Sequence, residues 1–237
     1  MDKLETGHHI SQRFNEELDD IRHQVLAMGG FVEQQLTDAI TAFVNRDIQL
    51  AEQVINNDYK VNAMEVAIDE ECTQILARRQ PAASDLRLIM AVIKTITDLE
   101  RIGDEVEKVA RMAVHLSELE AGNDSTYIEI QHLGYHVRQM LHDTLDALAR
   151  TDVEAAIRIA QEDIKVDREY EASLRQMITY MMEDPRSIRR MIDMIWTVRA
   201  LERVGDHSGN ICEYIIYLVK GKDVRHISLA QMEQEAR

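Results

Sequence analysis

The sequence predicts an all-α protein made of two tandem, pseudo-symmetric three-helix bundles, which together contain six long antiparallel helices. Aromatic residues are only 5% of the 237 residues and there are two prolines, which disfavours a fold rich in strands and turns. Apolar residues recur at intervals of three and four along most of the chain. A six-residue motif also occurs twice, as Leu99-Glu100-Arg101-Ile102-Gly103-Asp104 and as Leu201-Glu202-Arg203-Val204-Gly205-Asp206.

Three helices are expected in the first half of the chain. The first extends from about residue 10 to residue 45, with apolar positions at helical spacing throughout. Asp47 is placed to cap the second helix, which continues to about residue 79. Pro81 marks the next turn, and the third helix covers about residues 82–119.

The same order of elements restarts after the sequence Ala-Gly-Asn-Asp-Ser at 121–125, which is the clearest linker. A helix over about 126–149 is followed by Thr151-Asp152-Val153-Glu154, which fits a capping box. The fifth helix ends near residue 182, and Pro185 opens a sixth that ends near Gly221. We therefore predict one repeat in 1–121, a second in 122–221, and a polar tail in 222–237.

The net charge of the chain is −16, from 43 acidic and 27 basic residues. Such a charge disfavours binding to nucleic acid and to anionic lipid. The N-terminus lacks the pattern of a signal peptide, and no run of about 18 apolar residues occurs. We expect a soluble cytoplasmic protein that does not insert into membranes, with Cys72 and Cys212 as buried, reduced thiols.

The repeated motif places unfavourable residues inside helices. A glycine in a helix interior costs about 1 kcal/mol relative to alanine. Glu100 and Asp104 lie four positions apart, as do Glu202 and Asp206, so two like charges share each helical face. A chain that accepts both costs twice is expected to use these carboxylates.

Acidic residues of the preceding helices lie at matching heights. Counting from each turn at 1.5 Å per residue places Asn62 opposite Glu100 and Asp58 opposite Asp104. The second half repeats this arrangement within a residue or two. Two clusters of oxygen ligands suited to a hard cation such as Mg²⁺, Mn²⁺ or iron are thus predicted. They consist of Asp58, Asn62, Glu100 and Asp104, and of Asp163, Asp167, Glu202 and Asp206.

The simpler alternative is a solvated acidic surface neutralised by Arg101 and Arg203. Repetition of the whole arrangement favours the cation sites over this alternative.

Enzyme classes find less support, because no convincing nucleophile–base pair and no glycine-rich phosphate loop is present. A di-metal enzyme of ferritin-like type needs E-x-x-H on two helices, and Glu129–His132 is the single copy well inside a helix. A histidine phosphotransfer bundle needs one reactive histidine, and the sequence does not single one out among His23, His115, His136 and His142.

Both copies of the motif, together with several other segments, resemble the PhoU family of accessory proteins of phosphate-specific transport. The other segments are Met28-Gly29-Gly30, Ala67-Ile68-Asp69-Glu70, Arg79-Gln80-Pro81, Ser84-Asp85-Leu86-Arg87 and Asn210-Ile211-Cys212-Glu213-Tyr214-Ile215. The resemblance implies a cytoplasmic regulator of bacterial phosphate homeostasis that is not an enzyme. Such a protein couples the phosphate ABC transporter, through its ATPase subunit, to a sensor histidine kinase. It helps to keep phosphate-starvation (Pho regulon) signalling off when phosphate is abundant. A homodimer is also expected.

The metal-associated motifs of this family map onto the residues already singled out. The resemblance implies metal ligation, often multinuclear, by the pairs Glu100/Asp104, Glu202/Asp206 and Asp163/Asp167. Asp58 matches the family pattern, but Asn62 replaces the expected second acid and leaves the first site one charge poorer. His207 follows Asp206 and is expected at the surface, with a supplementary metal ligand as the alternative.

Overall fold

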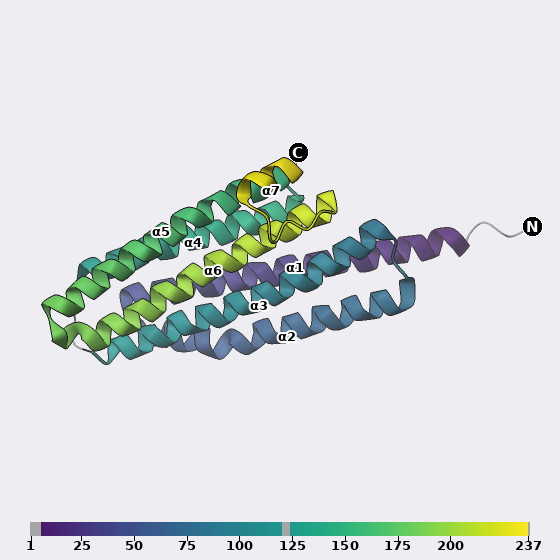
Figure 1. The fold of residues 1–237 in the computed structure, drawn as a ribbon. Coiled ribbons are helices and arrows are strands. Elements are labelled where there is room, and N and C mark those ends of the chain that lie inside the picture. Colours follow the sequence, from purple (N-terminus) through teal and green to yellow (C-terminus); the bar gives the residue numbers. More distant parts are fainter. Residues whose placement is uncertain (1–5, 120–123, 237) are drawn as a thin grey trace, which may run out of the picture.

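The computed structural model describes residues 6–119 and 124–236 (Figure 1). These residues contain seven α-helices, one 3₁₀ helix and no strand, so the predicted all-α class is confirmed. Within this part of the chain, no helix combines the length and the apolar character needed to cross a membrane. The helices are α1 (Thr6–Asn45), α2 (Ile48–Arg79), α3 (Ala83–Ser117), α4 (Asp124–Arg150), α5 (Val153–Glu183), η1 (Pro185–Ser187), α6 (Ile188–Lys220) and α7 (Leu229–Ala236).

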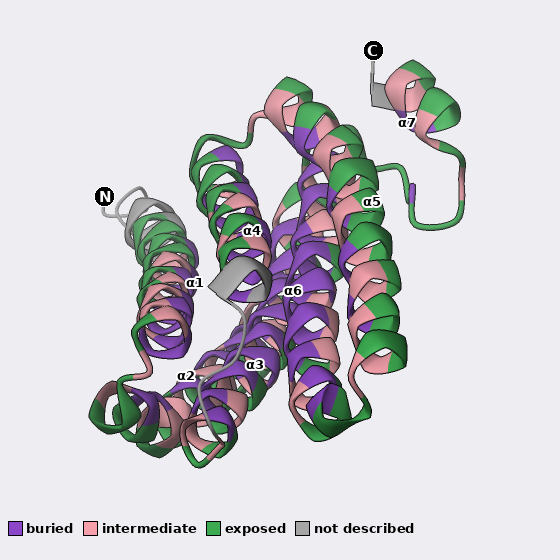
Figure 2. Ribbon diagram, turned by 90° about the vertical axis from the view of Figure 1, so that its left-hand side faces the viewer, coloured by how far each residue is buried: buried purple, intermediate pink, exposed green. Residues whose placement is uncertain are grey.

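The six long helices form two bundles that lie side by side. Helices α1, α2 and α3 pack on one another, as do α4, α5 and α6. The bundles meet where α3 lies against α6 and where α1 lies against α4. Helices α3 and α6 are buried along much of their length, whereas α2 and α5 bury a single stripe (Figure 2). The α3/α6 seam is therefore the centre of the molecule.

Two glycines show that the halves are related by a pseudo-two-fold axis. Gly29 of α1 faces Leu145 of α4, and Gly134 of α4 faces Ile40 of α1. Each residue of the first contact lies 105 positions from its counterpart in the second. A Cβ atom at Gly29 would lie 2.4 Å from a methyl carbon of Leu145, and one at Gly134 would lie 3.1 Å from Ile40. The small residues thus allow α1 and α4 to approach closely on both sides of the axis.

The motif glycines play the corresponding part within each bundle. A Cβ atom at Gly103 would lie 3.1 Å from Val61 of α2, and one at Gly205 would lie 3.2 Å from Val166 of α5. The cost of glycine inside α3 and α6 is therefore offset by close packing against the neighbouring helix. The carboxylates on either side of each glycine are drawn toward that same helix.

The turns that precede α2 and α5 also match. Asp47 accepts a hydrogen bond from Leu50 N (3.0 Å) and Asp152 accepts one from Ala155 N (2.9 Å). The residues just before them, Arg46 and Thr151, have positive φ values of 54° and 51°. The cap expected at Asp47 is confirmed. The capping box expected from Thr151 is wrong, because Asp152 is the N-cap and Thr151 belongs to the left-handed turn before it.

Other differences from the expected elements lie at their ends. Helix α1 begins at Thr6 rather than near residue 10, and Asp124 and Ser125 of the expected linker belong to α4. Residues 121–123 of that linker lie outside the described residues. The expected polar tail contains α7, which packs on α5 and buries Met232, while Val224 before it is also buried. A short helix with one apolar face carries too few periodic residues for the sequence to separate it from a tail.

The two cysteines match expectation. Cys72 and Cys212 are unpaired and buried. Burial raises the pKa of each thiol to about 12, so neither forms the reactive thiolate near neutral pH.

Substitution of Gly103 by leucine tests the close packing of α2 and α3. Gly103→Leu is expected to lower the free energy of unfolding by about 1–3 kcal/mol, because the new side chain meets Val61. Gly30→Leu is the matched control, since a Cβ atom there has nothing within 4 Å. It is expected to raise that free energy by about 0.5 kcal/mol through helix propensity. Urea unfolding followed by circular dichroism measures both, and equal effects would contradict this account.

Candidate metal centre

The second predicted cluster forms between α5 and α6. Asp167 comes from α5, and Glu202 and Asp206 come from the facing side of α6. Each of the three offers a carboxylate oxygen, and these oxygens all lie within 4.8 Å of one another. Bonds of about 2.0–2.6 Å between a hard cation and oxygen place the ligands of one ion about 3–5 Å apart. The trio therefore fits a single divalent cation.

Asp163 is the fourth predicted member, and two glycines leave room for its carboxylate. Its Oδ1 lies 3.3 Å from where a Cβ atom at Gly205 would stand, and its Oδ2 lies 3.8 Å from the same point at Gly209. Asp167 and Asp206 are its charged neighbours. All four predicted residues of the second cluster thus lie in one neighbourhood.

The metal-free cluster holds its carboxylates in an unfavourable state. Burial, followed by repulsion from Asp206, raises the pKa of Glu202 to about 7. Burial, followed by repulsion from Asp206 and Asp167, raises the pKa of Asp163 to about 6. Burial and Asp167 also raise the pKa of Asp206. A bound cation would remove these penalties, because an opposite charge favours the ionised form.

Hydrogen bonds within the described residues leave part of the cluster unpaired. Asp163 Oδ1 and Glu202 Oε2 are buried without a hydrogen-bond partner there. The other oxygen of Glu202 accepts a hydrogen bond from Arg199 (2.8 Å). Arg203, expected to neutralise the cluster if it were plain acidic surface, pairs with Glu105 of α3 (2.7 Å), and its charge lowers the pKa of Asp206 less than burial and Asp167 raise it. Unpaired buried oxygens favour a cation site over a solvated acidic face.

The first predicted cluster is looser. Asn62 of α2 donates a hydrogen bond to Asp58 (3.1 Å). Burial raises the pKa of Asp58, with Glu107 and Asp104 adding to the effect. Burial also raises the pKa of Glu100, with Asp104 as the largest charged contributor. The four predicted residues therefore share one neighbourhood between α2 and α3.

In the described residues, this first neighbourhood holds no trio of carboxylates as close as the second one. Two acids that the spacing argument missed, Glu65 and Glu107, contribute to its field. Each lies three positions beyond a predicted member, so the helical period contained the signal. Asn62 supplies an oxygen without charge, and this Oδ1 is buried and unpaired among the described residues.

His207 is not a surface residue, so that expectation is wrong. It is 6% exposed, and its Nδ1 lies 2.7 Å from Oδ1 of the buried Asp98 on α3. Asn210 donates to the same oxygen (3.1 Å), and the Tyr214 hydroxyl donates to Asp98 Oδ2 (2.7 Å). These hydrogen bonds lower the pKa of Asp98 against the opposing effect of burial. The residue after Asp206 therefore joins the two repeats across the α3/α6 seam.

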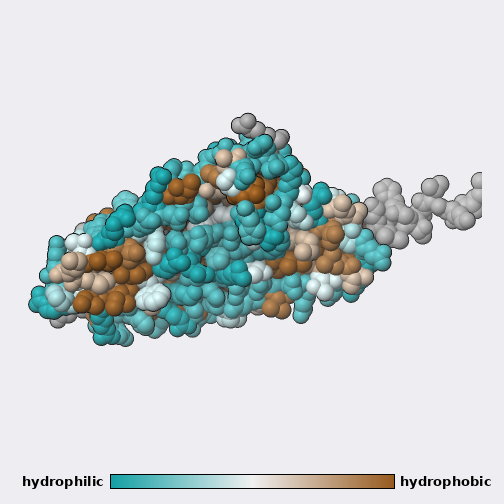
Figure 3. Space-filling view, viewed as in Figure 1, coloured by the Kyte–Doolittle hydropathy of each residue, from teal (hydrophilic) through white to brown (hydrophobic). Residues whose placement is uncertain are grey.

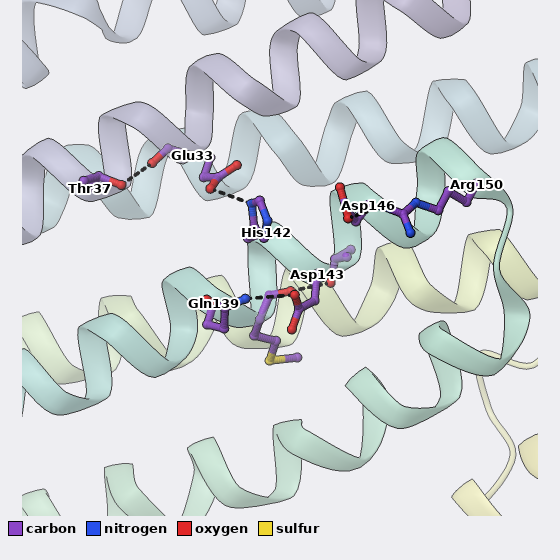
Figure 4. Close-up of polar contacts among 9 residues, drawn as sticks. Glu33, Thr37, Gln139, His142, Asp143, Asp146 and Arg150 are labelled. Atoms are coloured by element: carbon purple, nitrogen blue, oxygen red, sulfur yellow. Dashed lines mark hydrogen bonds and ion pairs between the residues drawn. The ribbon is translucent and has the colours of Figure 1, made fainter.

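Most of the residues on which the enzymatic alternatives depended lie on α4, whereas His23 lies on α1 and His115 on α3. His142 of α4 reaches Glu33 of α1, with 3.0 Å between Nδ1 and Oε1 (Figure 4). Nearby polar residues of α4 pair with one another, as Gln139 does with Asp143. Glu129 and His132 also lie on α4, and His132 is exposed. The only metal-compatible trio in the described part of the chain includes neither of them.

Comparison with known proteins gives a consistent match. The PhoU domain model matches residues 25–113 and 130–215. The chain is 55% identical to the phosphate-specific transport system accessory protein PhoU homolog of Pseudomonas aeruginosa, over 96% of this chain and 94% of that protein. It is 52% identical to PhoU of Escherichia coli, over 99% of this chain and 96% of that protein.

The chain belongs to the PhoU family. The crystal structure of PhoU from Pseudomonas aeruginosa has a TM-score of 0.85 and 54% identity, and the match covers 88% of this chain and 100% of that one. The structure of the phosphate transport system regulatory protein PhoU from Streptococcus pneumoniae has a TM-score of 0.82 at 31% identity, covering 89% and 99%. The two segments matched by the PhoU model fall in the two bundles. These PhoU relatives are named as accessory or regulatory proteins of phosphate transport.

Metal-free protein is expected to lose stability as the pH rises through the folded-state pKa values of this PhoU cluster. The pKa of Asp163 rises from 3.8 to about 6 and that of Glu202 from 4.5 to about 7, so the folded state binds more protons than the unfolded chain in this window. The free energy of unfolding therefore falls between about pH 4 and pH 7. Glu202→Gln should flatten this fall and exceed wild type by about 1–2 kcal/mol at pH 8, after allowance for solvent screening.

The measurement is urea unfolding at several pH values in the presence of a chelator. Glu118→Gln, which changes an exposed acid outside the cluster, is the control and should parallel wild type. A Glu202→Gln profile that also parallels wild type would contradict the proposed burial of charge.

Proposed function

We propose that this chain is a cytoplasmic, non-enzymatic regulator that represses phosphate-starvation signalling and modulates phosphate uptake. In this proposal it couples the phosphate ABC transporter to the sensor histidine kinase of the phosphate regulon. Membership of the PhoU family supports the link to phosphate transport. The main observation in support of a metal site is the group of three carboxylate oxygens within 4.8 Å of one another, with a fourth acid, Asp163, beside them.

The second cluster is proposed to hold a hard cation, namely Mg²⁺, Mn²⁺ or iron. Asp167, Glu202 and Asp206 would supply its carboxylate ligands, with Asp163 beside them. The cation would neutralise acids that otherwise repel one another, and so would hold α5 and α6 together. Asp58, Asn62, Glu100 and Asp104 form a weaker site, because Asn62 brings no charge. The role proposed for the metal is to fix the shape of the bundle, not to perform chemistry.

Partner binding is proposed to use apolar surface at the ends of the molecule. Figure 3 shows hydrophobic patches near both ends of one face, separated by a hydrophilic middle. Ile188, Ile192 and Trp196 are exposed at one end of α6, with Trp196 61% exposed. Leu86 and Met90 of α3 are exposed at the positions related to Ile188 and Ile192 by the repeat. Patches of this kind commonly mark protein interfaces. They are the surfaces proposed for the transporter ATPase subunit, the kinase and a second copy of the chain.

Metal content of the purified protein tests the sites. Glu202→Gln combined with Asp206→Asn is expected to remove cation from the second cluster without loss of helicity, because both changes preserve side-chain shape. Glu100→Gln combined with Asp104→Asn is the matched change in the first repeat, and should remove less metal. Chelator-free purification followed by elemental analysis and Mn²⁺ titration measures both. Negligible metal in wild type, with the second-repeat variant indistinguishable from it, would refute the metal site. The cluster would then be a solvated acidic surface.

Deletion of the gene tests the regulatory role. Expression of phosphate-scavenging genes is expected to rise in phosphate-rich medium, because the repressing contact is lost. Complementation with the Glu202→Gln/Asp206→Asn variant then separates metal binding from repression. Low expression in the deletion strain, or turnover of a substrate by purified protein at an enzymatic rate, would refute the regulator proposal.

A further inference from the structure

A cavity of about 310 Å³ opens where the two repeats meet, near the start of α3 and the ends of α4 and α6. Its lining surface is half apolar and half polar, and the apolar part includes Val25 of α1, Leu88 and Val92 of α3, and Leu218 of α6. Arg22 and His23, both exposed, line it as well. Its volume lies at the lower end of the range for ligand pockets.

The pseudo-two-fold axis provides an internal comparison for this cavity. On α1 and α4, equivalent residues lie 105 positions apart, as the Gly29/Gly134 pair illustrates. Arg22 therefore corresponds to Tyr127, and Leu148, which also lines the cavity, corresponds to Phe43. Tyr127 is 7% exposed and its ring centroid lies 5.5 Å from that of Phe43. The second repeat thus buries a tyrosine ring at the position where the first repeat has the exposed Arg22.

A second pair of equivalent residues, Arg46 and Thr151, also differs between the two sites. The guanidinium of Arg46 lies over the Tyr127 ring, 4.9 Å from the centroid. Its counterpart in the repeat is Thr151, which lines the cavity. Two residues that line the cavity, Leu148 and Thr151, thus correspond to the Tyr127 neighbours Phe43 and Arg46, while Arg22 stands at the position of the tyrosine ring.

The hydrogen bonding of one threonine that lines the cavity also differs from that of its counterpart in the other repeat. Thr95 of α3 lines the cavity, is 1% exposed, and its hydroxyl has no hydrogen-bond partner among the described residues. Its counterpart, Thr197 of α6, donates its hydroxyl to the Asp193 carbonyl oxygen (2.9 Å). A buried hydroxyl without a partner carries an energetic cost that a ligand group can relieve.

We propose that this cavity binds a single aromatic ring bearing a hydrogen-bonding group, of which phenol is the simplest. The ring would lie against the apolar part of the lining, in the place that Tyr127 takes in the other repeat. The Thr95 side chain would turn its buried hydroxyl toward the cavity to pair with the polar group of the ligand. Two sources have this chemistry, a tyrosine side chain presented by a partner protein and a free phenolic molecule. This binding is independent of the carboxylate clusters and of the proposed regulatory role.

Titration of the full chain with p-cresol, the analogue of the tyrosine side chain, tests the proposal. Saturable shifts of amide NMR signals from Val25, Val92 and Leu218 are expected, with a dissociation constant of about 1 mM, which is typical for a ligand of this size. Arg22→Tyr should abolish these shifts, because it supplies the ring from within the chain. Ala27→Tyr, at an exposed position of the same helix, is the matched control and should bind p-cresol as wild type does.

Two further comparisons test the hydroxyl contact and the source. Toluene lacks the hydroxyl and should bind wild type several-fold more weakly than p-cresol, whereas Thr95→Val should remove this preference. The peptide Gly-Tyr-Gly, compared with Gly-Ser-Gly, represents a side chain from a partner. Binding of p-cresol and Gly-Tyr-Gly supports a protein source, and binding of p-cresol alone supports a free small molecule.

The proposal is overturned if wild type shows no saturable binding of p-cresol. It is also overturned if toluene binds equally well, or if binding persists in Arg22→Tyr. Circular dichroism checks the fold of that variant. If it does not fold, Ala91→Phe fills the cavity from α3 and must abolish binding instead.

Discussion

Close approach of neighbouring helices at two motif glycines determines where the carboxylates of this protein meet. Gly103 packs on Val61 and Gly205 packs on Val166, so each motif helix lies near the preceding helix of its own bundle. Glu202 and Asp206 flank Gly205 by three positions and one position, and this approach brings them to Asp167. At Gly205 the missing side chain also leaves space for the Asp163 carboxylate. The same residue thus permits helix packing and shapes the candidate metal centre.

The second motif helix serves two neighbours because of its periodicity. Glu202 and Asp206 face α5, whereas Arg203 and His207, one position further on, face α3 and contact Glu105 and Asp98. Any shift of α6 that accompanies cation binding would therefore also displace the contacts that α6 makes with α3 at the seam between the repeats. Asp98 and Glu105 are 2% and 4% exposed, so these polar contacts lie in the interior, where losing one partner is costly.

Most of the fold followed from the sequence because a duplicated helical pattern is a strong local signal. The positions of all six long helices and the aspartate at the start of α2 were predictable, as was the neighbourhood of Asp163, Asp167, Glu202 and Asp206. Contacts between the repeats were not. Helical spacing places His207 on a face of α6, but the partner of that face depends on the axis relating the bundles, which no local pattern records. Asp98 was missed for this reason, whereas α7 was missed because a helix of eight residues carries too few periodic positions.

Duplication then leaves each copy free to diverge, and two of the differences lie at the carboxylate clusters and at the cavity. The glycine contacts and the left-handed turns are kept in both halves. Asn62 stands where the second half has Asp167, and Arg22 stands where the second half has Tyr127. A substitution at Gly29 or Gly134 would disturb both bundles, because these residues pack α1 against α4, whereas a change at one carboxylate cluster affects a single bundle. The same scaffold can therefore hold one more acidic and one less acidic centre, and one filled and one open cavity.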